Sequence, residues 1–137
     1  MELGDIGADI RNYQDGEHIF QEGDEGRHLF IVVSGAVQIL KGGEQFSSAL
    51  GTCCEGEIIG ELAVVDSHPR SASAIALGET ELAVFDKDTF LEAIRARPEL
   101  ALEVIASLGR KLRSTNENLQ ETRSAYMRLR AEEDPES

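Results

Sequence analysis

One stretch near the middle of the chain, Ile59 to Ser73, constrains the fold more than any other part of the sequence. It begins with Gly60 and Glu61, and a lone arginine, Arg70, follows nine residues after the glutamate. Pro69 stiffens the chain just before the arginine. Apolar, strand-like sequence lies on both sides. The pattern predicts a loop between two strands that binds a ligand closely.

The residue types in this stretch suit a phosphate group. Gly60 has no side chain, so its backbone can come close to a ligand. Residues 61–64 could form one helical turn, whose first N–H groups lack partners and favour an anion. Arg70 offers a planar fork of donors, and Ser71 adds a hydroxyl. Glu61 could accept from a sugar hydroxyl or from Arg70; the alternative is an ordinary Glu61–Arg70 ion pair across a loop.

Two motifs in this stretch resemble the phosphate-binding cassette of cyclic nucleotide-binding domains. They are Gly60-Glu61-Leu62-Ala63 and Pro69-Arg70-Ser71-Ala72. Glycines at 16, 23, 26 and 35 and the apolar run 29–32 also match the family's pattern. The resemblance extends from about Tyr13 to the end of the C-terminal helix.

The resemblance implies a β-barrel or jelly roll, followed by a long helix, with a cyclic nucleotide bound in the barrel. The ligand contacts that it implies are Ile59, Gly60, Glu61, Leu62, Ala63, Arg70, Ser71, Ala72, Thr115 and Asn116. Residues 60–63 would hold ribose and phosphate, Arg70 and Ser71 the phosphate, and Thr115 and Asn116 the base. Bacterial family members carry serine at the second of the base positions, so the departure to asparagine puts that contact in doubt.

Outside the cassette, short apolar runs alternate with turns that contain glycine. We expect strands at 17–20, 28–33, 36–40, 45–51, 72–77 and 81–85, with turns at 34–35 and 78–80 among others. Glycines at these turns serve backbone geometry. This spacing predicts a mainly β fold, a barrel or sandwich, with flanking helices.

Short helices are expected on either side of the strands. Ile6 and Ile10 lie at helical spacing near the N-terminus. Asp86 is expected to cap a helix over 88–95, with Phe90, Leu91 and Ile94 as its packing face.

A long helix is expected over residues 98–131, starting at Pro98. Its seam alternates steps of three and four residues: Ile105, Leu108, Leu112, Thr115, Leu119, Thr122, Tyr126 and Leu129. Such heptads predict a parallel coiled coil and a homodimer; the alternative is a monomer whose helix packs on its own barrel. Polar Thr115 could contact the base or only set the helix register. We therefore divide the chain into a β domain (1–97), a dimerisation helix (98–131) and an acidic tail (132–137).

Composition excludes several classes of function. A net charge of −13 disfavours direct nucleic-acid binding. There is no apolar run long enough to cross a membrane and no signal peptide, so we expect a cytoplasmic protein. Adjacent Cys53 and Cys54 indicate reduced strand residues rather than a metal site. The histidines show no metal-ligand spacing and no nucleophile has a recognisable base, which argues against an enzyme of the cupin or hydrolase type.

We therefore expect a sensor that binds cyclic AMP, with cyclic GMP as the alternative, and that acts on an unknown protein effector by moving its C-terminal helix. A ligand-free dimerisation scaffold of the same fold is a second hypothesis, and a cupin-type enzyme, which would need a metal, is a third. We expect no cofactor besides the nucleotide. Bacterial transcription factors of this family continue with a helix-turn-helix domain, so this chain is expected to be either a stand-alone sensor or a fragment.

Overall fold

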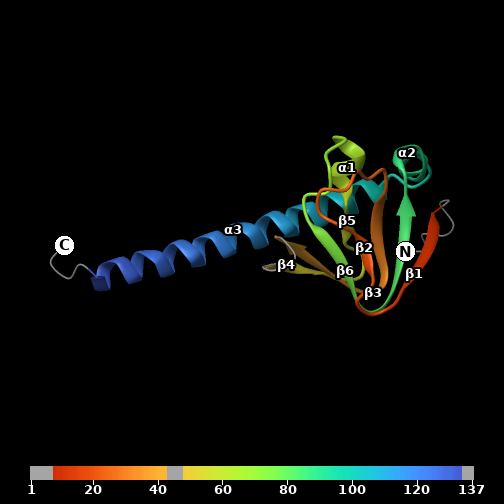
Figure 1. Ribbon diagram of the computed structural model, residues 1–137. Coiled ribbons are helices and arrows are strands. Elements are labelled where there is room, and N and C mark those ends of the chain that lie inside the picture. Colours follow the sequence, from red (N-terminus) through yellow and green to blue (C-terminus); the bar gives the residue numbers. More distant parts are fainter. Residues whose placement is uncertain (1–7, 43–47, 134–137) are drawn as a thin grey trace. The chain divides into compact units, whose positions relative to one another are not determined.

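The computed structural model describes residues 8–42 and 48–133. Its elements are β1 (Asp9–Tyr13), β2 (His18–Phe20), β3 (Leu29–Lys41), β4 (Ser48–Cys53), β5 (Ile58–Ile59), α1 (Glu61–Val65), β6 (Ser73–Phe85), α2 (Lys87–Ala96) and α3 (Glu99–Glu133) (Figure 1). The chain divides into two compact units, Met1–Val104 and Ile105–Ser137. The first contains the strands, α1, α2 and the start of α3, and the second contains the rest of α3.

Strands β3 and β6 form the centre of the sheet. They run antiparallel, from the pair Leu29–Phe85 to the pair Leu40–Ser73. β1 and β2 pair with two different parts of β6, and β4 and β5 pair with two parts of β3. The order is β1-β6-β3-β4, and no ladder between described residues joins β4 back to β1. The mainly β fold with flanking helices is confirmed, but its hydrogen-bonded sheet is not closed into a complete barrel.

The expected turns at 34–35 and 78–80 are wrong, because both segments lie inside long strands. β3 and β6 each continue through 13 residues. Gly35 has a φ of 86°, and the β3–β6 register shifts twice here, between Val32 and Ser34 and between Ser34 and Ala36. These are marks of a β-bulge, which bends a strand without ending it. A Cβ at Gly35 would lie 2.5 Å from the Glu79 carbonyl oxygen, so the close approach of the two strands requires glycine here.

Where residues 29–32 of β3 lie beside residues 82–85 of β6, both faces of the central strands are buried, which explains why these runs are continuously apolar. Leu29 and Ile31 belong to one core cluster together with Phe85, whereas the alternate residues Phe30 and Val32 belong to a second. Successive side chains of a strand point to opposite faces, so neighbours in sequence enter different clusters. We call the cluster of Phe30 the inner cluster and that of Leu29 the outer cluster.

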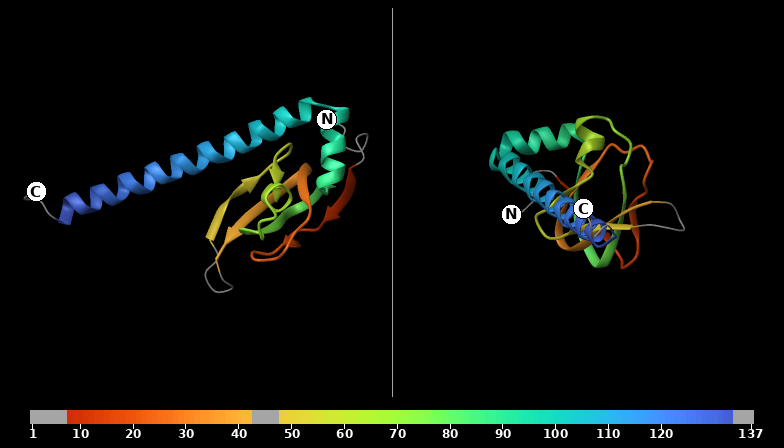
Figure 2. Two further views of the ribbon diagram at one scale, coloured as in Figure 1. Left: turned by 90° about the horizontal axis from the view of Figure 1, so that it is seen from above. Right: turned by 90° about the vertical axis from the view of Figure 1, so that its left-hand side faces the viewer.

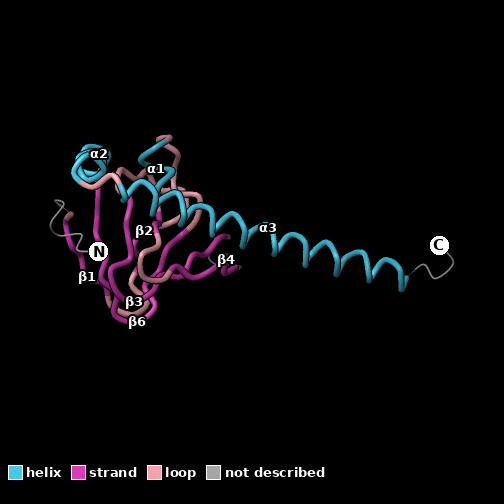
Figure 3. Tube along the Cα trace, turned by 180° about the vertical axis from the view of Figure 1, so that it is seen from behind, coloured by secondary structure: helices cyan, strands magenta, loops and turns pink. Residues whose placement is uncertain are grey.

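Helices α1 and α2 lie at the same end of the strands (Figures 1 and 3). α2 has the expected cap: the Thr89 N–H donates to Asp86 Oδ1 at 2.8 Å, and the Asp86 N–H donates to Thr89 Oγ1 at 2.9 Å. Phe90 packs in the outer cluster and Ile94 packs against it, both as expected, but Leu91 is exposed and Ala93 is buried in its place. The packing face of this short helix is therefore shifted by part of a turn.

The expected N-terminal helix is wrong for Ile10, which lies in β1, while Ile6 lies outside the described residues. β1 pairs antiparallel with β6, from Asp9–Val84 to Tyr13–Thr80, and forms a strand at the edge of the sheet. None of the helices in the described ranges combines the length and apolarity that a bilayer crossing requires.

Helix α3 is a single continuous helix (Figure 2) of 35 residues, about 50 Å at ~1.5 Å per residue. Its first turns belong to the strand-rich unit, where Leu100 is completely buried in the outer cluster with Val104 packed against it. From Ile105 onward, its apolar seam residues with described side chains are exposed.

Candidate functional site

Backbone hydrogen bonds join the cassette to the turn that follows β2. Gly23 donates its N–H to the Arg70 carbonyl at 2.8 Å, and Arg70 donates its N–H to the Asp24 carbonyl at 2.8 Å. Gly23 has a φ of 88°, which glycine adopts without a Cβ penalty. This reciprocal pair fixes the backbone of Arg70 before β6 begins.

The Arg70 side chain turns inward and is only 7% exposed. Its Nη1 donates to the Gly60 carbonyl at 3.1 Å, and its Nη2 donates to the His28 carbonyl at 2.9 Å. Gly60 has a left-handed φ of 77° and immediately precedes α1. The guanidinium is therefore held by two backbone carbonyls, one from the start of the cassette and one from the segment that leads into β3.

Two glycines leave the space that the guanidinium occupies. A Cβ added at Gly60 would overlap Nη1, and one added at Gly26 would overlap the Cζ and Nε of Arg70. Any side chain at either position would have to displace the guanidinium. The absence of side chains at Gly26 and Gly60 thus matters for where Arg70 can lie, not only for turn geometry.

Two aromatic rings of the inner cluster lie close to the same guanidinium. Arg70 Cζ is 4.2 Å from the centroid of the Phe20 ring and 5.7 Å from that of Phe30. Aromatic faces carry partial negative charge and attract cations within about 6 Å. The arginine therefore reaches the apolar interior of the sheet rather than the solvent.

One donor of this buried cation has no acceptor. Arg70 Nε is buried and has no hydrogen-bond partner among the described residues. Burial lowers the pKa of Arg70 from its ordinary value, and the negative charges of Asp24 and Glu61 oppose that shift. A buried N–H that lacks an acceptor is costly, and an anionic oxygen would relieve the cost. The arrangement suits a small anion better than it suits a purely structural arginine.

The structure brings together some of the residues that the sequence singled out. Gly60 and Arg70 are joined by a hydrogen bond, and residues 61–63 form most of the expected helical turn, α1. Ile59, Ala63 and Ala72 are buried, whereas Leu62 and Ser71 are exposed. Thr115 and Asn116 lie in α3, but their side chains are outside the described residues.

Sequence reasoning missed Phe20, His28 and Phe30, and assigned Gly26 only a turn role. His28 contributes a backbone carbonyl, which any residue has, so no sequence signal could have found it. Phe20 and Phe30 look like ordinary alternating strand residues. Only the pairing of both β2 and β3 with β6 brings their rings to the arginine.

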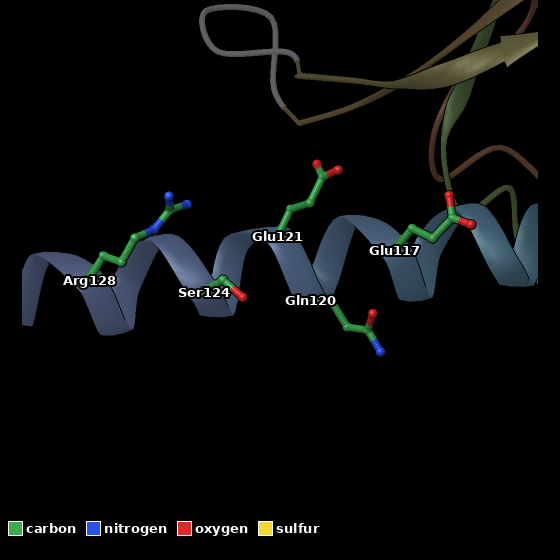
Figure 4. Close-up of a pocket in the computed structure, with 5 residues that line it drawn as sticks. All are labelled: Glu117, Gln120, Glu121, Ser124 and Arg128. Carbon is green, nitrogen blue, oxygen red and sulfur yellow. The ribbon is translucent and has the colours of Figure 1, made fainter.

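A separate groove of about 390 Å³ runs along α3 and is lined by Glu117, Gln120, Glu121, Ser124 and Arg128 (Figure 4). All five side chains belong to one helix, and Gln120 points away from Glu121 in the figure. Two carboxylates on this face would repel a phosphate. The groove therefore does not compete with Arg70 as an anion site. Among the described residues, no group of three His, Cys, Asp or Glu side chains could hold a metal ion.

Comparison with protein families identifies the class of this domain. Residues 10–97 match the model of the cyclic nucleotide-binding domain, a range that includes the whole cassette and the strands around it. The chain belongs to this family, and it is a regulatory, cyclic nucleotide-binding domain.

The chain is also similar to bacterial cyclic AMP regulators. It is 38% identical over 109 residues to the cyclic AMP receptor protein of Thermus thermophilus, covering 77% of this chain and 50% of that protein. It is 34% identical over 108 residues to a CRP-like cAMP-activated global transcriptional regulator of Mycobacterium tuberculosis, covering 76% of this chain and 47% of that protein. The chain thus spans about half the length of these two curated relatives.

A solved structure agrees with these sequence relationships. The crystal structure of the Thermus thermophilus catabolite activator protein superposes with a TM-score of 0.71 at 33% identity, over 88% of this chain and 59% of that one. The fold, the family and the two cassette motifs at residues 60–63 and 69–72 therefore indicate the same class of regulatory domain.

Proposed function

We propose that this domain is a cyclic AMP sensor. Two relatives that match about three quarters of its length are a cyclic AMP receptor and a cAMP-activated regulator, and their names support cyclic AMP as the ligand. In this proposal residues 60–63 hold ribose and phosphate, Arg70 and Ser71 hold the phosphate, and Thr115 and Asn116 contact the base. The domain itself catalyses no reaction.

The observation that carries the proposal is the buried guanidinium of Arg70, whose Nε–H has no acceptor in the described part of the chain. A phosphate oxygen accepting from that N–H would form a charge-assisted hydrogen bond in a poorly solvated site, where such bonds are strong. Two glycines and two carbonyls hold the group in place before any ligand arrives. Preorganisation of this kind reduces the entropic cost of binding.

The decisive experiment is a calorimetric titration of cyclic AMP into the wild-type chain and into Arg70→Ala. Charge-assisted hydrogen bonds are worth about 1.5–3 kcal/mol each, so affinity should fall about a hundredfold or more. Arg27→Ala is the matched control, because Arg27 is exposed and its loss changes the net charge equally. Arg27→Ala should bind like the wild type. Equal affinity of Arg70→Ala and Arg27→Ala would place the phosphate elsewhere.

Cyclic GMP is the second candidate ligand, because of the residue after the arginine. Ser71 is exposed, so its hydroxyl is accessible to a ligand beside Arg70. That hydroxyl could bind the amino group of guanine or the phosphate. Side-by-side titrations of both nucleotides into the wild type and Ser71→Ala decide between these roles. A loss confined to cyclic GMP indicates base contact, and an equal loss for both indicates phosphate contact.

We further propose that α3 carries the signal and forms a homodimer through its heptad seam. A ligand that contacts both the cassette and α3 would favour one arrangement of the two over another, and only such a difference in affinity shifts an equilibrium. The effector would then be a protein that recognises one state. If the wild-type chain shows no thermal shift with either nucleotide, the ligand-free scaffold replaces the sensor, because a bound ligand must stabilise the fold.

A further inference from the structure

We propose that Phe20 is a positioning residue for anion binding: its ring fixes the plane of the Arg70 guanidinium. This inference rests on the proposed function and deepens it. It identifies a side chain outside the cassette that keeps the cassette's cation ready for phosphate.

The contact comes from a strand that is distant in sequence from the cassette. Phe20 is the last residue of β2 and pairs with Ala74 of β6. Its ring centroid is 4.2 Å from Arg70 Cζ, and the same ring lies 6.0 Å from the ring of Phe30, tilted by 33°. The Phe20 ring thus packs against the inner cluster and also contacts the cation.

The hydrogen bonds of Arg70 leave one rotation free. Nη1 and Nη2 bond to the Gly60 and His28 carbonyls, and these two points define a line through the end of the guanidinium. The bond from Nε to Cδ and the backbone at Gly26 restrain the group further, so only a limited tilt about that line remains, and Nε, which lies off the line, moves most in it. A ring in contact with Cζ opposes this remaining tilt and so holds the plane. Nε is a buried nitrogen with no hydrogen-bond partner among the described residues, and the ring controls the orientation of its N–H.

An aromatic ring suits this task better than a carboxylate. The ring attracts the guanidinium through its negative face and uses none of its N–H donors. A carboxylate in the same place would accept from the donors that an anion needs and would repel the anion. Burial disfavours the charged form of Arg70, and the ring partly offsets that effect without competing for the ligand.

The first test measures cyclic AMP affinity by calorimetry in Phe20→Leu and in Phe20→Tyr. Removing the ring frees the tilt, so a smaller fraction of molecules is competent to bind and the apparent Kd rises. A cation–ring contact of this kind corresponds to a three- to thirtyfold loss, roughly, in Phe20→Leu. Phe20→Tyr keeps the ring and should bind like the wild type. Phe90→Leu is the matched control, since Phe90 lies in the outer cluster, and its affinity should be unchanged.

The second test observes the guanidinium directly in the free protein. The Arg70 ¹⁵Nε–¹Hε signal, assigned by its loss in Arg70→Lys, should be distinct and slow to exchange with water in the wild type and in Phe20→Tyr. It should broaden or move to the position of a free arginine in Phe20→Leu. Identical signals in the wild type and Phe20→Leu would overturn the inference.

The two tests separate the two levels of the proposal. Wild-type chain that takes no cyclic AMP contradicts the proposed function, and the signal in the free protein still decides whether Phe20 positions Arg70. If the wild type binds cyclic AMP and Phe20→Leu binds it equally tightly, the role of Phe20 is contradicted and the sensor function is not.

Discussion

The two compact units differ in the exposure of their apolar side chains. In the strand-rich unit, Leu29, Ile58, Leu82 and Leu100 are buried almost completely. In the second unit, the seam residues Leu112, Leu119, Tyr126 and Leu129 are 60–63% exposed. Both regions show regular apolar periodicity in the sequence. Periodicity therefore identifies a face that can be buried, but not what covers it.

The comparison also separates two kinds of evidence for function. Arg70 is surrounded by groups of its own unit, so the contacts that support its role are present within a single chain. The α3 seam is supported by its heptad pattern and by the exposure of its apolar side chains, and its proposed partner is a second copy of the chain. The predictions below test each side of this difference, beginning with the largest expected effect.

Leu119→Asp should convert the proposed dimer into a monomer. The substitution introduces a charge into the seam of both helices and removes two leucines that the dimer would bury, each worth about 2 kcal/mol. Dimer affinity should fall about a thousandfold or more. Met127→Asp is the control, because Met127 is exposed but lies off the seam. Sedimentation velocity across a concentration series gives the answer, and a wild-type chain that stays monomeric throughout refutes the dimer.

Leu100→Ala should destabilise the strand-rich unit by about 3 kcal/mol. Leu100 is completely buried in the outer cluster, and deleting its side chain leaves a cavity. Leu102, two residues further along the same helix, is 68% exposed, so Leu102→Ala should change stability by less than about 0.5 kcal/mol. Urea unfolding followed by circular dichroism compares the two variants. Similar losses of stability in the two variants would mean that Leu100 is not the buried residue of this turn of α3 and Leu102 the exposed one.

Gly109→Ala should stabilise α3 by about 0.5–1 kcal/mol, because glycine in a helix interior carries an entropic cost. A Cβ added at Gly109 would meet nothing within 4 Å among the described residues. Thermal unfolding followed at 222 nm measures the change. A destabilised variant would indicate that another surface packs closely against this glycine, such as the partner helix of the proposed dimer.

Asp86→Asn should reduce the dependence of the free energy of unfolding on pH at acid pH. The Thr89 N–H, and then its hydroxyl, donate to the Asp86 carboxylate and hold its pKa below the ordinary 3.8. A carboxyl whose pKa is lower in the folded state stabilises the fold above 3.8 and loses that contribution as the pH falls through the lowered value. Asparagine keeps an oxygen acceptor but does not titrate there. As the pH falls below about 4, the free energy of unfolding of Asp86→Asn should therefore approach that of the wild type. A constant difference between the two proteins over this range would exclude this cap as the cause.

Local chemistry made much of the fold predictable. The cap at Asp86, the helical turn after Gly60 and the long helix follow from short-range rules, and each lies close to its expected position. The turns at 34–35 and 78–80 failed because glycine is equally compatible with a turn and with a β-bulge. Only pairing between the two long strands, which is not a local property, decides between them.

The candidate site was predictable only in part. Gly60 and Arg70 carried a recognisable motif, and they do form a hydrogen bond. The His28 carbonyl and the Phe20 ring reach the arginine through strand pairing, so no spacing in the sequence reveals them. The base contacts of Thr115 and Asn116, and the dimer, remain predictions.

Adjacent residues of β5 divide between the two core clusters: Ile58 packs in the outer cluster with Leu100, and Ile59 packs in the inner cluster with Phe30. Gly60, which bonds Arg70, is the next residue. A backbone displacement at this glycine would carry the side chains of Ile58 and Ile59 the same way, pressing one into its cluster and drawing the other out. The position of the Arg70 cation would thus be coupled, through two residues of one strand, to the cluster that holds Leu100 of α3.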